Sequence, residues 1–297
     1  MIQSEFWQGH SAQVVFLRNP ALGACERASD VWQQTEVLLM VGGALLQLGR
    51  LQEAQPLFEQ AVTLRQSLYG PKDRRVAYAL SSLGNALSMQ GNLDGGIDAH
   101  ARAVVAAEAS LGRPHPNVAV LHQNLGDDYL YGLRIPEAVT ELQSALAVLD
   151  AAGEPKRREV AMVATDLGLA LLEAGEAEKA LTAFERANAL WDALSPEHPS
   201  HGEALMGEYQ ALVRLGRAAK VTELERALVF GKGLPPFERG RIELALGQAL
   251  GAATTPSARA MALVRQAIEG FAGSALPLVQ RDAELARQWV VMHEAKR

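Results

Sequence analysis

Two histidines and one cysteine are the first candidates for chemistry in this chain of 297 residues. His198 and His201 lie three positions apart, a spacing at which two imidazoles can bind one metal ion. They flank a proline in a predicted loop, and a third and a fourth ligand are not in view. We therefore expect no metal ion and interpret both histidines as solvated loop residues. Cys25 is the only cysteine, which excludes a disulfide within the chain, and we interpret it as a small buried residue.

Neighbouring carboxylates at Asp127 and Asp128 are the second candidate. General acid–base catalysis needs groups that face one substrate, whereas adjacent positions of a helix point in different directions. We therefore interpret Asp128 as a surface charge. An enzymatic site would need groups that converge from different elements, and Asp127 with Asp166 is the nearest such pair. The known nucleophile, nucleotide and zinc-protease motifs are absent from the sequence, so we expect neither an enzyme nor a cofactor.

Charge patterning bears on the class of partner. Six basic residues lie in two short segments, Lys72 to Arg75 and Lys156 to Arg158, without interleaved aromatic residues. The net charge is −6, which supplies no general attraction to nucleic acid or to anionic membranes. Residues 1–20 contain one apolar run of four residues, too short for a secretory signal or a membrane span. We expect a cytoplasmic protein that binds neither nucleic acid nor membrane.

The elements that position these residues are predicted by a pattern that recurs every 42 residues. Each segment carries a leucine followed by glycine at Gly84, Gly126 and Gly168, and the register extends backwards to Gly42. Self-similarity at a fixed period identifies a repeat architecture. Each unit reads as two amphipathic helices joined by a short turn, usually with glycine.

Columns within the repeats predict which helix faces meet. One column of the second helix is large and mostly apolar, and its members are Phe58, His100, Leu142 and Phe184. Glycine in the middle of the first helix costs roughly 1 kcal/mol relative to alanine. Its recurrence predicts that the paired helices approach too closely there for a larger side chain.

A mid-helix glycine, a small residue twelve positions later, and then a large apolar residue and an alanine resemble the tetratricopeptide repeat. The 42-residue period is similar to that of kinesin light chains and many bacterial regulatory proteins. The degenerate C-terminal units resemble the C-terminal regions of bacterial serine/threonine kinases, although the kinase loops themselves are absent from the sequence. The resemblance implies an all-α, right-handed superhelical solenoid of helix-turn-helix repeats with a C-terminal capping helix.

The predicted organisation has four parts. Residues 1–33 form an N-terminal segment that reads as a partial repeat, and residues 34–201 form four regular units. Residues 202–281 form two degenerate units, and residues 282–297 form the capping helix.

The same resemblance implies a partner-binding site, because the first helices of such repeats line the concave surface. Transferred to this chain, the binding positions are Tyr78, Ser81, Ser82, Asn85, Met89, Gln123, Asn124, Asp127, Tyr131, Thr165 and Asp166. Amides such as Asn85, Gln123 and Asn124 can each donate to and accept from the backbone of an extended peptide.

The sequence therefore favours a protein–protein interaction scaffold or sensor that binds a peptide or partner segment on its concave face. Three alternatives stay open. In the first, the chain is the non-catalytic regulatory tail of a kinase. In the second, it self-assembles through its end repeats into a homo-oligomer, and in the third it is a spacer whose polar face contacts only water.

Overall fold

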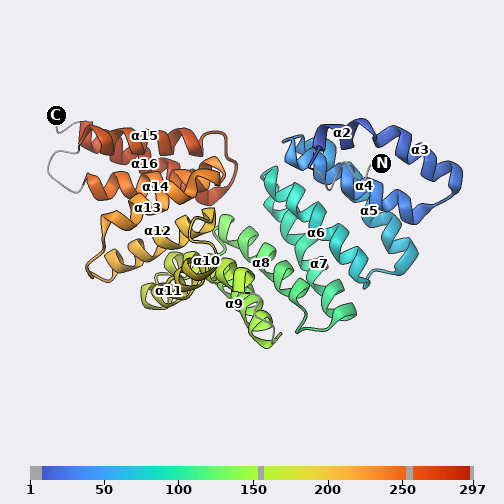
Figure 1. Ribbon diagram of the computed structural model, residues 1–297, viewed down its shortest axis with the longest axis horizontal. Helices are drawn as coiled ribbons and strands as arrows, with labels where there is room; N and C mark the ends of the chain where they lie inside the picture. The colour runs from blue at the N-terminus through green and yellow to red at the C-terminus, as the bar shows by residue number, and fades with distance from the viewer. Residues whose placement is uncertain (1–8, 153–156, 252–256, 295–297) are drawn as a thin grey trace. The chain divides into compact units, whose positions relative to one another are not determined.

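The computed structural model describes residues 9–152, 157–251 and 257–294 (Figure 1). Within these ranges the chain forms fifteen α-helices and one short 3-10 helix, with no strand. The prediction of an all-α array of helical repeats is confirmed. The described helices all lack the length and apolar character that crossing a membrane requires.

The chain divides into two compact units, Met1–Asp128 and Tyr129–Arg297. In the first unit the helices are α2 (Ser11–Phe16), α3 (Arg18–Ala28), α4 (Val31–Gln47), α5 (Leu51–Tyr69), α6 (Arg74–Met89), α7 (Leu93–Leu111) and the greater part of α8 (Pro116–Tyr131). In the second they are α9 (Ile135–Ala151), α10 (Arg157–Glu173), α11 (Ala177–Leu194), α12 (Pro199–Arg214), α13 (Val221–Phe230), η1 (Gly231–Gly233), α14 (Pro236–Leu250), α15 (Ala258–Phe271) and α16 (Pro277–Glu294).

Capping side chains determine where several helices begin. The Asp30 carboxylate accepts the N–H of Gln33 at 2.9 Å, and Asp73 accepts the N–H of Arg75 at 2.8 Å. Such caps satisfy amide groups that the first turn of a helix leaves without a partner. They allow α4 and α6 to start at defined residues, and α6 carries several of the binding positions discussed below.

The turns inside the repeats use a left-handed residue. Gly91 has φ of 82° and Gly175 has φ of 78°, and Leu133 occupies the equivalent position of the intervening unit with φ of 59°. A leucine in this region costs roughly 1–2 kcal/mol, because its Cβ approaches the following carbonyl oxygen. The turn geometry is therefore a property of the repeat and is kept where glycine is missing.

The predicted columns form the core. Phe58, His100, Leu142 and Phe184 are all buried. A Cβ atom placed on Gly42 would lie 2.5 Å from the Phe58 ring, and one on Gly168 would lie 2.6 Å from the Phe184 ring. The prediction that the glycine column permits close approach of paired helices is confirmed at these positions.

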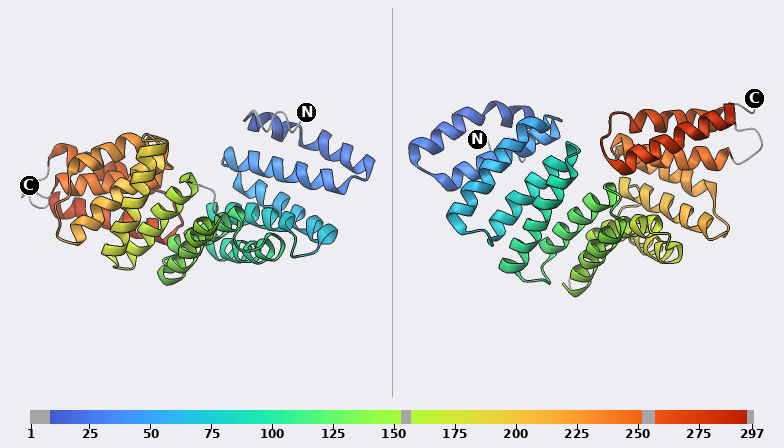
Figure 2. Two further views of the ribbon diagram at one scale, coloured as in Figure 1. Left: turned by 60° about the horizontal axis from the view of Figure 1, so that its bottom comes forward. Right: turned by 180° about the vertical axis from the view of Figure 1, so that it is seen from behind.

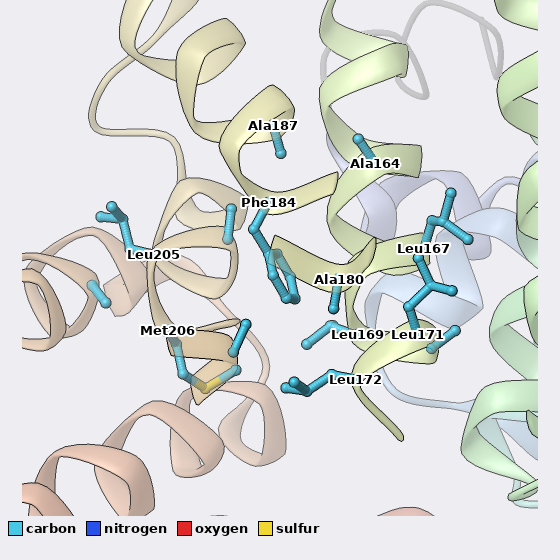
Figure 3. Close-up of a cluster of buried hydrophobic side chains, with 14 of the residues drawn as sticks. Ala164, Leu167, Leu169, Leu171, Leu172, Ala180, Phe184, Ala187, Leu205 and Met206 are labelled. Atoms are coloured by element: carbon cyan, nitrogen blue, oxygen red, sulfur yellow. The ribbon is translucent and has the colours of Figure 1, made fainter. Parts of the chain in front are cut away.

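The second unit contains two apolar clusters. Figure 3 shows Phe184 near the centre of the larger one, with Ala180, Leu172 and Met206 around it. The smaller cluster joins α14, α15 and α16, which Figure 2 shows side by side, through Leu244, Val264, Phe271, Val279 and Ala283.

The C-terminal helix differs from its predicted bounds. It begins at Pro277, before Asp282, because Leu278 and Val279 are also buried and continue its apolar stripe. The other predicted boundaries between regular, degenerate and capping segments remain predictions.

Candidate functional site

The binding positions predicted on α6 lie along one face of that helix. Tyr78 and Met89 are large apolar residues at the two ends of this face, and their exposed fractions are 62% and 58%. Ser81, Ser82 and Asn85 lie between them at helical spacing. Asn85 is exposed, and the Ser82 hydroxyl donates to the carbonyl oxygen of Tyr78 at 3.1 Å. This face of α6 therefore has an apolar side chain at each end and polar side chains between them.

The adjoining face of α8 contributes to the same surface within the first unit. The Asn124 side-chain N–H donates to the Ser81 hydroxyl at 3.3 Å, which joins the two helices. Gln123, Asn124 and Asp127 are partly exposed, and Val120 of this helix is 43% exposed. We call the surface formed by these positions of α6 and α8 the α6/α8 face. Its members are Tyr78, Ser81, Ser82, Asn85, Met89, Val120, Gln123, Asn124 and Asp127.

A buried polar network supports this face from below, and the sequence did not predict it. His100 of α7 is 1% exposed, and its Nδ1 lies 2.7 Å from the Asp128 carboxylate. Its Nε2 lies 3.1 Å from Oδ1 of Asn85. The interpretation of Asp128 as a surface charge is therefore wrong, because its side chain is buried against His100. Since Nε2 faces an amide, the network holds a surface side chain in place.

In the second unit the predicted positions lie in a different environment. The Tyr131 hydroxyl donates to Glu238 of α14 at 3.4 Å, and its ring packs edge-on against Phe237 at 5.7 Å. Thr165 is buried, and its hydroxyl donates to the carbonyl oxygen of Ala161 at 2.9 Å. Thr165 therefore contributes to packing here and presents no accessible group to a partner.

Asp166 belongs to a group of carboxylates in the second unit. Burial and, to a smaller extent, the charge of Asp166 raise the pKa of Glu238 to about 7, although Arg241 opposes the shift. Burial also raises the pKa of Glu203 well above its ordinary value, with the charges of Glu238 and Asp166 adding to it. Protonation relieves the repulsion among these groups, because neighbouring buried carboxylates resist full ionisation.

Replacing Glu238 by glutamine is expected to flatten the pH dependence of stability between about pH 4.5 and pH 8. A carboxyl group with a raised pKa holds a proton in the folded state that it has lost in the unfolded state. Its contribution to stability is therefore lost as the pH rises through about 7. At pH 8 we expect Glu238→Gln to be more stable than the wild type by on the order of 2 kcal/mol, with little difference near pH 4.5.

Urea unfolding at a series of pH values measures this effect, and Glu284→Gln is the matched control because Glu284 is an exposed glutamate of the same unit. If the free energy of unfolding depends on pH in the same way for the wild type and Glu238→Gln, the raised pKa of Glu238 is contradicted.

The sequence also missed an ionic network in the second unit. Arg281 of α16 makes two hydrogen bonds to Glu173 of α10, at 2.6 and 3.0 Å, and binds Asp282. Arg241 of α14 pairs with Asp282 at 3.2 Å. These arginines lie in the segments where the repeat register is weakest, which is why column analysis did not find them.

Two earlier interpretations concern single residues. His201 is fully buried and its Nδ1 bonds to the carbonyl oxygen of Pro196 at 2.6 Å, while His198 stacks on Trp191 at 4.3 Å. The interpretation as a solvated loop residue is therefore wrong for His201, which is buried within α12, whereas His198 lies partly exposed in the turn before that helix. Cys25 is buried as expected, and burial raises the pKa of its thiol. Among the residues that the structure describes, no group of three or more histidine, cysteine or acidic side chains is arranged to hold a metal ion.

Comparison with known proteins identifies the repeats. The family model described as tetratricopeptide repeat matches residues 33–95 and 75–151. No curated protein sequence matches the chain.

Solved structures share the fold at low sequence identity. BtubC (BKLC) from P. vanneervenii is 16% identical with a TM-score of 0.61, over 80% of this chain and 92% of that one. A kinesin-light-chain type protein of Podosopora anserina, with nearly identical TPR-like repeats, is 19% identical with a TM-score of 0.57, over 66% of this chain and 95% of that one. The C-terminal part of a TPR repeat-containing protein from Cytophaga hutchinsonii is 12% identical with a TM-score of 0.53, over 95% of this chain and 97% of that one.

Proposed function

Because residues 33–151 are tetratricopeptide repeats, a fold that typically serves protein–protein interaction, we propose that this chain binds an extended segment of a partner protein on the α6/α8 face. The other predicted positions, Tyr131 and Asp166, lie in the second unit. Thr165 takes no part, since it is buried.

The observation that carries the proposal is exposed apolar surface on a face that is otherwise polar. Tyr78, Met89 and Val120 are all large, apolar and substantially exposed, and they lie on the same two helices as the amides of Asn85 and Asn124. Clustered exposed apolar side chains with a polar rim are typical of surfaces that bind another protein. Anchors at both ends of α6 suit side chains that alternate along an extended segment.

The polar centre of the face fits a peptide backbone. An extended peptide presents N–H and C=O groups that need partners once water is displaced. Asn85, Gln123 and Asn124 carry amides that can donate and accept. Their contacts with His100 and Ser81 keep two of these amides in place before a partner arrives, which lowers the entropic cost of binding.

The charges on the binding positions favour a neutral or basic segment. Asp127 lies on the α6/α8 face, and Asp166 lies beside Glu203 and Glu238 in the second unit. Arg65 lies 5.8 Å from the Tyr78 ring, but its guanidinium is bound by Glu36. An acidic peptide tail would bring further negative charge beside these carboxylates, and this repulsion opposes binding.

Fluorescence titration of two classes of labelled peptide tests the proposal. We expect basic peptides with leucine anchors to bind, and peptides that end in an acidic tail to bind at least about tenfold more weakly. Asn124→Ala is expected to weaken binding about tenfold, the effect of one or two hydrogen bonds to a partner. Asn117→Ala is the matched control, because Asn117 is an exposed asparagine at the start of the same helix.

Two other outcomes would count against the proposal. Failure of every peptide in a diverse library would leave a face that meets only water. Concentration-dependent light scattering of the chain alone, without peptide binding, would favour self-assembly.

A further inference from the structure

Four columns of the repeat are interrupted within the first compact unit: three departures lie in the repeat of residues 76–117, and the fourth lies in the repeat that follows it. At equivalent positions the other regular repeats carry apolar residues, whereas these positions carry serine, glycine, histidine and aspartate. Ser88 replaces Leu46, Leu130 and Leu172; Gly96 replaces Ala54, Ala138 and Ala180; His100 replaces Phe58, Leu142 and Phe184; and Asp128 replaces Ala44, Ala86 and Ala170.

The four residues are close together although they come from three helices. His100 Nδ1 lies 2.7 Å from the Asp128 carboxylate. A Cβ atom on Gly96 would collide with the Ser88 hydroxyl and would lie 3.0 Å from the Asp128 carboxylate. An alanine at position 96, as in the other units, would therefore displace both polar groups. The departures belong to one buried polar site.

The site reaches the surface at Asn85. A Cβ atom on Gly84 would lie 2.5 Å from the His100 ring, so the ring fills the space beside the α6 backbone. From there its Nε2 reaches Oδ1 of the exposed Asn85 at 3.1 Å. Burying a histidine and a carboxylate costs free energy that an apolar pair would avoid, as the neighbouring units show. A role at the surface would account for the cost.

The state of the histidine decides which end of the Asn85 amide faces outward. Both ring nitrogens face oxygen atoms, and only the doubly protonated imidazolium can donate to both. In that state the Asn85 NH₂ group points away from the ring. A neutral ring that keeps its proton on Nδ1, toward Asp128, makes Nε2 an acceptor. The amide must then turn its NH₂ group inward and its oxygen outward.

We propose that His100, held by Asp128, is a positioning residue that sets whether Asn85 offers a donor or an acceptor to a bound segment. This inference rests on the proposed binding function of the α6/α8 face. Asp128 from α8 is the charged group that faces the ring, while α6 contributes the uncharged Asn85 and Ser88. Loss of the ring proton therefore changes the hydrogen-bonding pattern of the binding surface itself.

The test uses substitutions copied from equivalent positions of the other repeats. His100→Phe alone would leave Asp128 buried and unpaired, so it is combined with Asp128→Ala. The double variant restores the residue types found at these positions in neighbouring units, and it is expected to fold.

Nuclear magnetic resonance of the free protein tests the positioning role without any partner. In the wild type, the Asn85 side-chain amide signals are expected to change with pH in parallel with the ring signals of His100. In the double variant this shift is expected to vanish, while the Asn117 side chain serves as an unaffected reference. Identical Asn85 titrations in both proteins, or an Asn85 signal that ignores pH in the wild type, would overturn the proposal.

Peptide affinity then separates this inference from the function on which it rests. For a basic leucine-anchored peptide, affinity is measured on either side of the transition that the ring signals of His100 show; we expect about a tenfold change in the wild type and less than about twofold in the double variant. Equal pH dependence in both proteins would overturn the inference and leave the binding face intact. No binding to the wild type, with the Asn85 shift still present, would reject the proposed function alone.

Discussion

Replacing Phe184 by alanine is expected to lower the free energy of unfolding by roughly 3–5 kcal/mol, as large-to-small changes in a packed core do. Phe184 is fully buried, and its ring occupies space that glycines on two other helices leave open. Gly168 of α10 and Gly207 of α12 both lie directly against the ring. Because neighbouring side chains are small or already packed, the cavity cannot close without moving a helix.

Urea unfolding followed by circular dichroism measures this loss. Phe184→Leu is the matched control, since Leu142 occupies the same column in the preceding unit. We expect the leucine variant to lose less than about 1.5 kcal/mol. A loss below about 1 kcal/mol for Phe184→Ala would mean that the column does not carry the packing of the second unit.

Replacing Asp282 by alanine is expected to cost a similar amount, roughly 3–5 kcal/mol, for a different reason. Asp282 and Arg241 are both buried and pair at 3.2 Å, and Asp282 also accepts from Arg281 at 2.9 Å. Removing the carboxylate leaves the Arg241 charge buried without its ion-pair partner. The cost reflects that stranded charge more than the net strength of the pair.

Hydrogen exchange in α14 and α16, together with urea unfolding, measures the effect. Glu284→Ala on the same helix is the control, because Glu284 pairs with Arg287 at the surface and exposed pairs contribute below about 1 kcal/mol. Similar losses for the two variants would show that the Arg241–Asp282 pair is not the buried link between these helices.

The repeat period allowed much of the core to be predicted. A residue in the large column is buried whether it is Phe58, Leu142 or His100, since the column follows from helix geometry and not from residue type. The mid-helix glycines were also predicted correctly, because their cost within a helix implies a close neighbour. Both inferences rest on regularity and weaken where the register is lost, as at Arg241 and Arg281.

The candidate site was less predictable, because transfer by position ignores what lies beneath each residue. Thr165 occupies a binding position yet is buried, since its hydroxyl bonds within its own helix. Asp128 was interpreted as a surface charge because its partner His100 lies on another helix. The two residues are 28 positions apart, and the pattern of residues within one helix does not reveal such a contact. The signal in the sequence was the replacement of apolar column residues by polar residues and glycine, and these replacements lie together around His100 in the first unit.

The α6/α8 face can be compared with the outer face of the same unit. Val120 lies on α8 within the proposed face, whereas Val105 of α7 is 59% exposed on a second helix. Aspartate at either position removes a similar exposed apolar surface and adds the same charge. The two variants therefore differ in which face of the repeats they alter.

The affinity of a basic leucine-anchored peptide for Val120→Asp and Val105→Asp is the most direct test that the first helices form the binding face. We predict that Val120→Asp weakens binding at least about tenfold and that Val105→Asp changes it less than about twofold. Loss of binding in Val105→Asp with unchanged binding in Val120→Asp would contradict the account.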